Sequence, residues 1–80
     1  MKIPRDVSGQ EFVALLKRNG FSVSRQNGSH IRLTSITLPH YHITIPNHKP
    51  IKIGTMNNIL TELTLHFKLS KEEVIKKLFS

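Results

Sequence analysis

The chain has 80 residues, of which 38% are hydrophobic, and a net charge of +7 from 12 Lys and Arg against 5 Asp and Glu. This length suits one domain over residues 1–80 and leaves no room for a large enclosed pocket. Cysteine is absent, which excludes disulfides and thiolate metal sites. No apolar run approaches the roughly 20 residues of a membrane span, and the N-terminus lacks an apolar signal region. We therefore expect a cytoplasmic protein without a membrane partner.

The distribution of charge favours a polyanionic partner. Residues 12–61 contain no Asp or Glu, but they hold six Lys and Arg residues and four His residues. All the acidic residues lie in the flanking parts of the chain. Such a segment should carry a positive potential that attracts RNA. A solvated surface charge without a partner is the alternative interpretation.

The N-terminal part predicts a helix. Ser8 and Glu11 have the spacing of a capping box, in which each residue binds the backbone N–H of the other. The helix should end near Asn19-Gly20, because glycine adopts the left-handed conformation of a helix C-terminus. Its apolar face is expected to contain Phe12, Leu15 and Leu16.

Two strands joined by a hairpin should follow this helix. Apolar and polar residues alternate over residues 21–24 and again over residues 30–34. Asn27-Gly28 between them is typical of a hairpin turn. A two-residue loop would split the apolar residues across both faces of the sheet. We therefore predict a three-residue turn or a bulge at Asn27-Gly28.

The register of this hairpin decides which side chains face solvent. With an odd number of loop residues, Val23 lies opposite Ile31 or Leu33, and the apolar side chains of both strands share one face. In either register His30 and Arg32 point away from the core. Both side chains would then be available to a ligand.

The C-terminal half predicts one more strand and two helices. Residues 41–45 alternate so that His42 and Thr44 point outward, and Thr55 is the expected N-cap of the second helix. A second capping box at residues 70–73 should open a short final helix. The core stripe of the second helix is predicted to consist of Met56, Ile59, Leu60, Leu63 and Phe67. The predicted class is α+β, with three antiparallel strands and the helices on one sheet face.

Gly28-Ser29-His30 is the candidate catalytic segment. An exposed histidine exchanges protons near neutral pH, and a glycine lets the backbone approach a phosphate closely. Arg25 and Arg32 are near enough in sequence to bind phosphate oxygens. RNA cleavage through the 2′-hydroxyl requires a base, an acid and charge stabilisation, but no metal. An ordinary exposed strand histidine is the alternative interpretation.

Two further groups of residues have the composition of possible binding sites. Lys49 and Lys52 flank the turn into the second helix, whose free N–H groups attract anions, although loop lysines beside a capped helix would look the same. His40 and His42 have a strand spacing that places two ligands on one face, with His48 nearby. Because no carboxylate lies near them in sequence, we expect neither a metal site nor a cofactor.

The chain resembles HicA-like toxins over roughly residues 8–67. The residues that carry this resemblance, in order, are Lys17-Arg18-Asn19-Gly20-Phe21, Arg25, Gly28-Ser29-His30, Ile45-Pro46-x-His48 and Gly54-Thr55-Met56-x-x-Ile59-Leu60. The resemblance implies a double-stranded-RNA-binding-like α-β-β-β-α fold and an mRNA endonuclease with His30 as catalytic residue. It also implies neutralisation by a HicB-like antitoxin. Residues 54–58 lack the lysine cluster of duplex-RNA readers, so single-stranded RNA is the expected substrate.

The leading hypothesis is a metal-independent endoribonuclease with His30 as general acid or base. Two alternatives stay open: a non-catalytic RNA-binding module on the same face, and a protein-interaction domain that uses apolar residues of the last helix. No second residue of an acid–base pair can be singled out. The residues expected to bind RNA are Arg25, Gly28, Ser29, Arg32, His48, Lys49 and Lys52.

Overall fold

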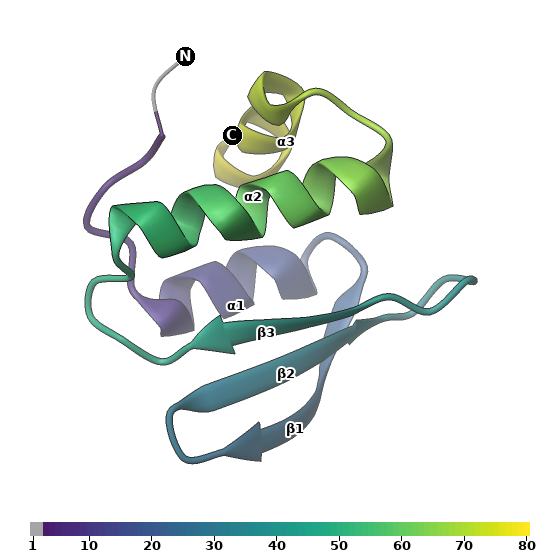
Figure 1. The fold of residues 1–80 in the computed structure, drawn as a ribbon. Helices are drawn as coiled ribbons and strands as arrows, with labels where there is room; N and C mark the ends of the chain where they lie inside the picture. The colour runs from purple at the N-terminus through teal and green to yellow at the C-terminus, as the bar shows by residue number, and fades with distance from the viewer. Residues whose placement is uncertain (1–2) are drawn as a thin grey trace.

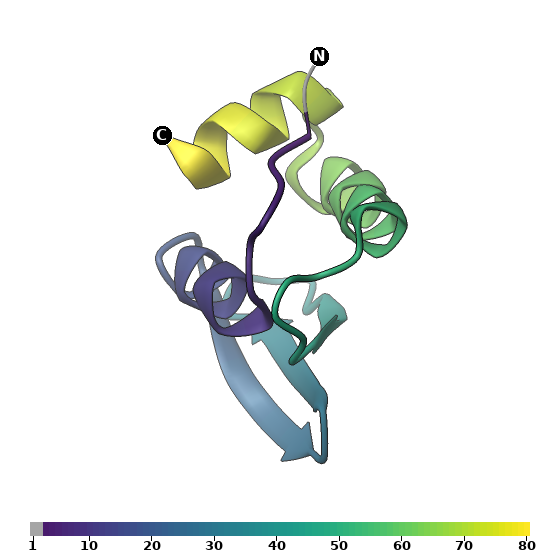
Figure 2. The ribbon, with the colours of Figure 1, turned by 90° about the vertical axis from the view of Figure 1, so that its left-hand side faces the viewer.

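The computed structural model describes residues 3–80 and confirms the predicted α+β order with its additional C-terminal helix. The elements are α1 (Gly9–Lys17), β1 (Phe21–Asn27), β2 (His30–Ser35), β3 (His42–Pro46), α2 (Ile53–Phe67) and α3 (Lys71–Phe79). The strands form one antiparallel sheet in the order β1-β2-β3. Figure 1 shows the helices above the sheet, and the turned view in Figure 2 shows the same separation. One face of the sheet is therefore uncovered.

Capping boxes begin α1 and α3, as predicted. The Ser8 hydroxyl accepts the Glu11 N–H at 3.1 Å, and the Glu11 carboxylate accepts the Ser8 N–H at 2.9 Å. Ser70 and Glu73 repeat this arrangement. The serine N–H and then the serine hydroxyl favour the charged carboxylate, which lowers the pKa of Glu11 and of Glu73. Both helix starts are thus set by residues three apart in sequence.

Helix α2 begins earlier than predicted. Its N-cap is Lys52, which makes no side-chain capping bond, and Thr55 lies inside the first turn. The prediction of Thr55 as N-cap is therefore wrong. Buried Ile51 donates its N–H to the Val7 carbonyl at 2.8 Å and anchors the chain just before the helix. This long-range contact sets the helix start, in place of a local capping residue.

The β1–β2 hairpin has a two-residue loop, so the predicted three-residue turn at Asn27-Gly28 is wrong. Asn27 lies directly opposite His30, and only Gly28 and Ser29 connect them. Gly28 has a φ of 61°, the left-handed conformation that glycine adopts most readily. The tight turn places His30 at the first position of β2.

The one-residue shift that places the apolar side chains of both strands on one face lies instead at a bulge within β1. Ser24 is left without a partner, and the register shifts by one residue there. Val23 consequently lies opposite Leu33, which is one of the two predicted registers. His30 and Arg32 are exposed, as predicted. Val23 is 42% exposed because it lies on an edge strand, whereas Leu33 on the central strand is fully buried.

The core lies between the sheet and the helices. In α2, Met56, Ile59, Leu60 and Leu63 are buried and Phe67 is half-buried, which confirms the predicted stripe. The strands contribute Phe21, Ile31, Leu33, Ile43 and Ile45, and α1 contributes Phe12, Val13 and Leu16. No helix within residues 3–80 is long and apolar enough to cross a membrane.

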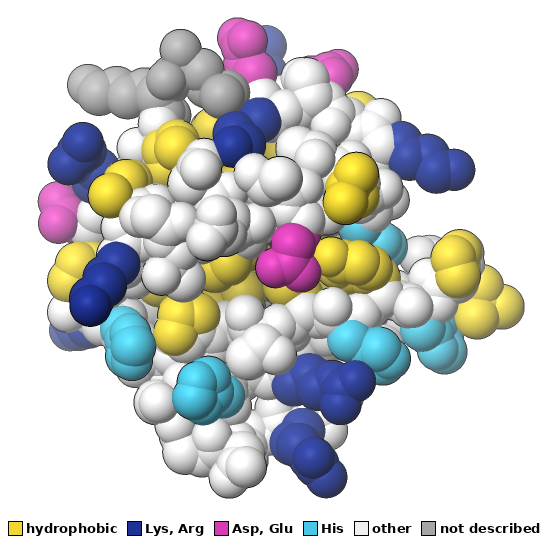
Figure 3. All heavy atoms as spheres, viewed as in Figure 1, with side chains coloured by type: hydrophobic (Ala, Val, Ile, Leu, Met, Phe, Trp, Pro, Cys, Tyr) yellow, Lys and Arg dark blue, Asp and Glu magenta, His cyan; other side chains and the backbone are white. Residues whose placement is uncertain are grey.

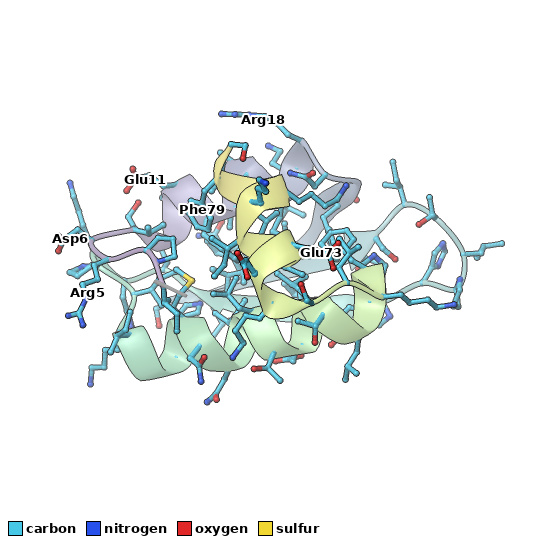
Figure 4. All side chains as sticks on the ribbon, turned by 90° about the horizontal axis from the view of Figure 1, so that it is seen from above. Arg5, Asp6, Glu11, Arg18, Glu73 and Phe79 are labelled. Atoms are coloured by element: carbon cyan, nitrogen blue, oxygen red, sulfur yellow. The ribbon has the colours of Figure 1, made fainter. Side chains whose placement is uncertain are left out.

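Helix α3 completes this core. Val74 and Leu78 are buried, and Ile75 and Phe79 pack against the core while remaining half-buried. The Phe79 ring lies 6.0 Å from the Phe12 ring, and Figure 4 shows Phe79 on the side of α3 that faces α1. The apolar residues of α3 therefore act largely as core, which removes most of the surface expected for partner docking.

Gly9 allows α1 to approach the loop between β3 and α2. Its N–H donates to the His48 carbonyl at 2.9 Å. A Cβ atom at Gly9 would overlap the Pro46 carbonyl oxygen and lie 2.8 Å from the Asn47 Cα. Because both neighbours are backbone atoms, neither can move aside alone. The position of the loop therefore depends on glycine at this point.

We predict that Gly9→Ala lowers the free energy of unfolding by about 1–3 kcal/mol, because the added methyl group forces α1 away from the loop. The measurement is chemical denaturation followed by circular dichroism. Gly54→Ala is the matched control, since nothing lies within 4 Å of its added Cβ and it lies in a helix. A Gly9→Ala protein as stable as the unsubstituted protein would contradict this packing.

Candidate nucleic-acid interface

The uncovered face of the sheet presents its side chains in rows across the strands. From the β1–β2 turn inward, the rows are Asn27, His30 and Pro46, then Arg25, Arg32 and Thr44, then Ser22, Thr34 and His42. Neighbouring rows are about 7 Å apart, because alternate residues share a face and a strand rises about 3.3 Å per residue. The face therefore offers a series of polar positions along the strands, suited to an extended ligand.

Two arginines face each other in the middle row. Arg25 lies directly opposite Arg32, whose other cross-strand neighbour is Thr44. Like charges in opposite positions repel, and neither neighbour of Arg32 is acidic. Figure 3 shows Lys, Arg and His side chains over the strands in the lower part of the view, with no Asp or Glu side chain among them. An anion between the two guanidinium groups would turn this repulsion into attraction.

His30 lies at the end of this face, one row from the arginines. It follows the tight turn at Gly28 and is exposed. A Cβ atom at Gly28 would meet nothing within 4 Å, so the turn is open to an approaching ligand. The Ser29 carbonyl accepts the Asn47 N–H at 2.7 Å, which ties the turn to the loop after β3. The structure thus brings Arg25, Arg32 and the Gly28-Ser29-His30 segment together.

Lys49 and Lys52 lie apart from this group, on the helix side of the molecule. Lys52 is the N-cap of α2, and Lys49 lies near enough to Glu11 of α1 for its charge to add to the interactions with Ser8 that lower the pKa of Glu11. Figure 4 shows Asp6 and Glu11 at this same end. The segment that lacks acids in the sequence is therefore not free of acids once folded. The surface without acids is the outer face of the sheet.

His48 is held beside the β1–β2 turn through its backbone. Its carbonyl accepts the Gly9 N–H, and the preceding Asn47 bonds to Ser29. Its side chain is exposed. The loop therefore brings His48 to the same end of the sheet as His30, although the two lie far apart in sequence.

The structure also connects three side chains that sequence reasoning did not link. The Thr34 hydroxyl lies 2.9 Å from His42 Nδ1 and donates to the Ser24 hydroxyl at 2.9 Å, which donates to the Arg32 carbonyl at 3.2 Å. The contact between Thr34 and His42 can be predicted only if the pairing of β2 with β3 is known. The length of the loop between these strands does not determine that pairing.

The three histidines with a possible metal-ligand spacing do not form a cluster. His40 precedes β3 and lies in the loop, whereas His42 begins the strand, and His48 lies beyond its other end. The pair at positions 40 and 42 therefore does not share a strand face. Within residues 3–80 no group of three or more His, Cys, Asp or Glu side chains is placed to hold a metal ion.

A cavity lies at the opposite end of the sheet from His30. It has a volume of about 550 Å³ between the β2–β3 loop and the end of α2. His66 there packs against Phe21, Tyr41 and Phe67 with ring centroids 4.9–5.3 Å apart, and burial lowers its pKa. None of the predicted site residues lines this cavity. The candidate residues therefore belong to an open face and not to this cavity.

One known protein family matches most of the chain. A family model described as HicA toxin of bacterial toxin-antitoxin matches residues 9–65. The match begins at the start of α1, includes all three strands, and ends within α2. Searches of curated proteins and of solved structures gave no match. Since the matched segment is more than half of the 80 residues and contains the whole uncovered sheet face, the chain belongs to the HicA toxin family of bacterial toxin–antitoxin systems.

Proposed function

We propose that this toxin is a metal-independent endoribonuclease that cleaves single-stranded mRNA, with His30 as general acid or base. Membership of the HicA family supports a toxin that acts beside an antitoxin. The observation that carries the nuclease proposal is the position of His30. It is exposed at the end of a face without acidic side chains and lies one row from the opposed Arg25 and Arg32.

The proposed reaction uses the RNA itself as nucleophile. A base takes the proton of a 2′-hydroxyl, and the 2′-oxygen attacks the adjacent phosphorus. The bond from phosphorus to the 5′-oxygen breaks, and an acid protonates that oxygen. The products are a 2′,3′-cyclic phosphate and a 5′-hydroxyl. A histidine suits either proton transfer because it changes its charge near neutral pH.

The neighbouring residues supply binding and charge stabilisation in this proposal. The guanidinium groups of Arg25 and Arg32 hold the non-bridging oxygens, where negative charge accumulates in the transition state. Gly28 leaves the turn open to the phosphate, and the Ser29 hydroxyl can donate to it. His48, Lys49 and Lys52 bind RNA that continues past the turn.

Replacing the proposed catalytic histidine gives the direct test. We predict that His30→Ala lowers the cleavage rate of single-stranded RNA in EDTA by about 10²–10⁴-fold, because one proton transfer loses its side chain. His40→Ala is the matched control, since His40 is an exposed histidine in the loop at the far end of the sheet. Both variants should melt at the temperature of the unsubstituted protein, since both side chains are exposed.

Three outcomes would contradict parts of this proposal. Undiminished cleavage by His30→Ala would remove His30 from the chemistry. Binding of RNA by the unsubstituted protein without cleavage would instead favour a non-catalytic RNA-binding module. An RNA with a single 2′-deoxy sugar at the cleaved position should resist the enzyme. Its cleavage would exclude attack by the 2′-oxygen.

The two groups of basic residues should contribute unequally to RNA binding. In a His30→Ala background, the double substitution Arg25→Gln with Arg32→Gln should make the slope of log K for RNA binding against log salt concentration shallower by about 1.4. Each phosphate contact that is lost on single-stranded RNA removes about 0.7 from this slope. Lys49→Gln with Lys52→Gln should weaken binding less, because Glu11 already offsets part of the Lys49 charge. Fluorescence anisotropy over a series of salt concentrations measures both effects.

The control for this comparison is Lys17→Gln with Lys76→Gln. Both lysines are exposed on helices, so this pair removes the same net charge away from the sheet face. Equal losses from all three pairs would indicate attraction by net charge alone. The outer face would then have no special part in binding.

We also propose a HicB-like antitoxin as the protein partner. Expression of the chain should arrest bacterial growth, and co-expression of the antitoxin encoded beside it should restore growth. His30→Ala should not arrest growth but should still co-purify with the antitoxin, because an exposed side chain is not needed for folding. Growth arrest by His30→Ala equal to that by the unsubstituted toxin would show toxicity independent of cleavage.

A further inference from the structure

A histidine on the outer face is held in a fixed orientation although it is exposed. His42 begins β3, and its Nδ1 atom lies 2.9 Å from the Thr34 hydroxyl on the neighbouring strand. Thr34 in turn contacts Ser24 of β1, so one chain of side chains crosses all three strands. Exposed side chains usually keep their rotational freedom, because fixing them costs entropy. The connection therefore restrains a histidine that would otherwise be mobile.

The Arg32 carbonyl at the end of this series of hydrogen bonds determines which atom is the donor in each of them. The Ser24 hydroxyl donates to the Arg32 carbonyl, which can only accept. The single hydrogen of Ser24 is thereby used, so the Thr34 hydroxyl must donate to Ser24. Thr34 then has no hydrogen left for His42. The proton on the shared bond must therefore belong to His42 Nδ1.

This assignment determines what His42 offers to a ligand. A neutral imidazole carries one N–H and one lone pair. With the hydrogen on Nδ1, the lone pair lies on Nε2, at the other side of the ring from Thr34. Phosphate oxygens are acceptors and gain nothing from this atom. The ligand that fits it is a hydrogen-bond donor.

The bulge in β1 explains how the chain of hydrogen bonds is formed. The cross-strand partner of Thr34 is Ser22, yet the hydroxyl that Thr34 contacts belongs to Ser24. Ser24 is the unpaired residue at the register shift. Bulges redirect side chains in this way and are frequent next to functional sites. The same irregularity that aligns the core therefore also holds His42.

We propose that His42 is a second RNA-binding position, at which Nε2 accepts an N–H or O–H from a nucleotide neighbouring the one cleaved at His30. This inference rests on the proposed function. His42 lies two rows from His30, about 13 Å along the strands, with the opposed arginines in the row between them. An RNA strand whose phosphate is held by Arg25 and Arg32 would therefore place its next nucleotides at His42. His42 selects for a donor group, whereas the arginines bind any phosphate.

The hydrogen position can be tested without RNA. Long-range ¹H–¹⁵N spectra of the free protein should show His42 as the Nδ1–H tautomer. Thr34→Val keeps the shape of the side chain but removes the hydroxyl, so the Nε2–H tautomer should become populated. An Nε2–H tautomer in the unsubstituted protein would overturn the inference, whatever the protein does to RNA.

The binding role is tested with oligonucleotides of two lengths. His42→Ala should raise KM for a hexanucleotide roughly three- to tenfold, the effect of one hydrogen bond, and leave kcat unchanged. Thr34→Val should act in the same direction. Cleavage of a dinucleotide should not change, since its single phosphate lies at His30. His40→Ala is the matched control, because it removes an exposed imidazole from the loop before β3 and should change neither constant.

The donor is identified by changing one group of the hexanucleotide at a time. Loss of the His42 effect with a 2′-deoxy sugar outside the cleaved position assigns the contact to a 2′-hydroxyl, and loss with an altered base assigns it to a base N–H. A fall in kcat for both lengths would make His42 part of the chemistry and overturn this proposal. Cleavage that is unaffected by His42→Ala would overturn this proposal alone. Absence of both RNA binding and cleavage would overturn the proposed function as well.

Discussion

The pairing of β1 with β2 determines which side chains of β1 share the outer face with His30 and Arg32. A two-residue loop places Asn27 opposite His30, and a strand of regular alternation would then turn Phe21 and Val23 away from the core. The bulge at Ser24 removes this conflict by shifting the register once. Apolar residues near the start of β1 can thus face the helices while polar residues near the turn face solvent.

The outer face owes its chemistry to this shift. Beyond the bulge, Arg25 aligns with Arg32, and Asn27 aligns with His30. At the bulge itself, Ser24 reaches Thr34 and so holds His42. A single inserted residue therefore aligns Arg25 with Arg32, Asn27 with the proposed catalytic His30, and Ser24 with the Thr34 hydroxyl that holds His42. Their spacing along the strands follows from the pleat and needs no further support from the helices.

Three acidic residues of the helices make hydrogen bonds away from the outer face of the sheet. Glu11 and Glu73 accept serine N–H groups at the starts of two helices. Glu62 accepts the Tyr41 hydroxyl at 3.0 Å, and burial, together with this carboxylate, raises the pKa of Tyr41 to about 12. These three of the five acidic residues thus make hydrogen bonds away from the outer face of the sheet. The positive character of the outer face results from this division and not from the net charge alone.

Local patterns in the sequence were enough to predict the elements, whereas long-range contacts decided the details. The capping boxes at Ser8 and Ser70 were predictable because both partners lie within one turn of helix. The start of α2 was not, because Ile51 is anchored by a residue more than forty positions away. The apolar alternation showed that an offset was needed in the hairpin but could not show where.

The candidate site was predictable to the same extent. The outward direction of His30 and Arg32 follows from alternation alone and is confirmed. The separation of Lys49 from the arginines could not be predicted, because it depends on how α1 packs beside the loop after β3. The role of His42 depends on the pairing of two strands across an irregular loop, for which the sequence has no local pattern.

The opposed arginines also affect the protein when no RNA is present. Arg25 and Arg32 repel each other across the hairpin, and this repulsion opposes folding. Dissolved salt screens it, and any polyanion that binds between the two side chains removes it and stabilises the folded chain by mass action. Ligand affinity and conformational stability are therefore linked at one pair of residues. The folded toxin is therefore more stable with an anion bound between the two arginines than without one.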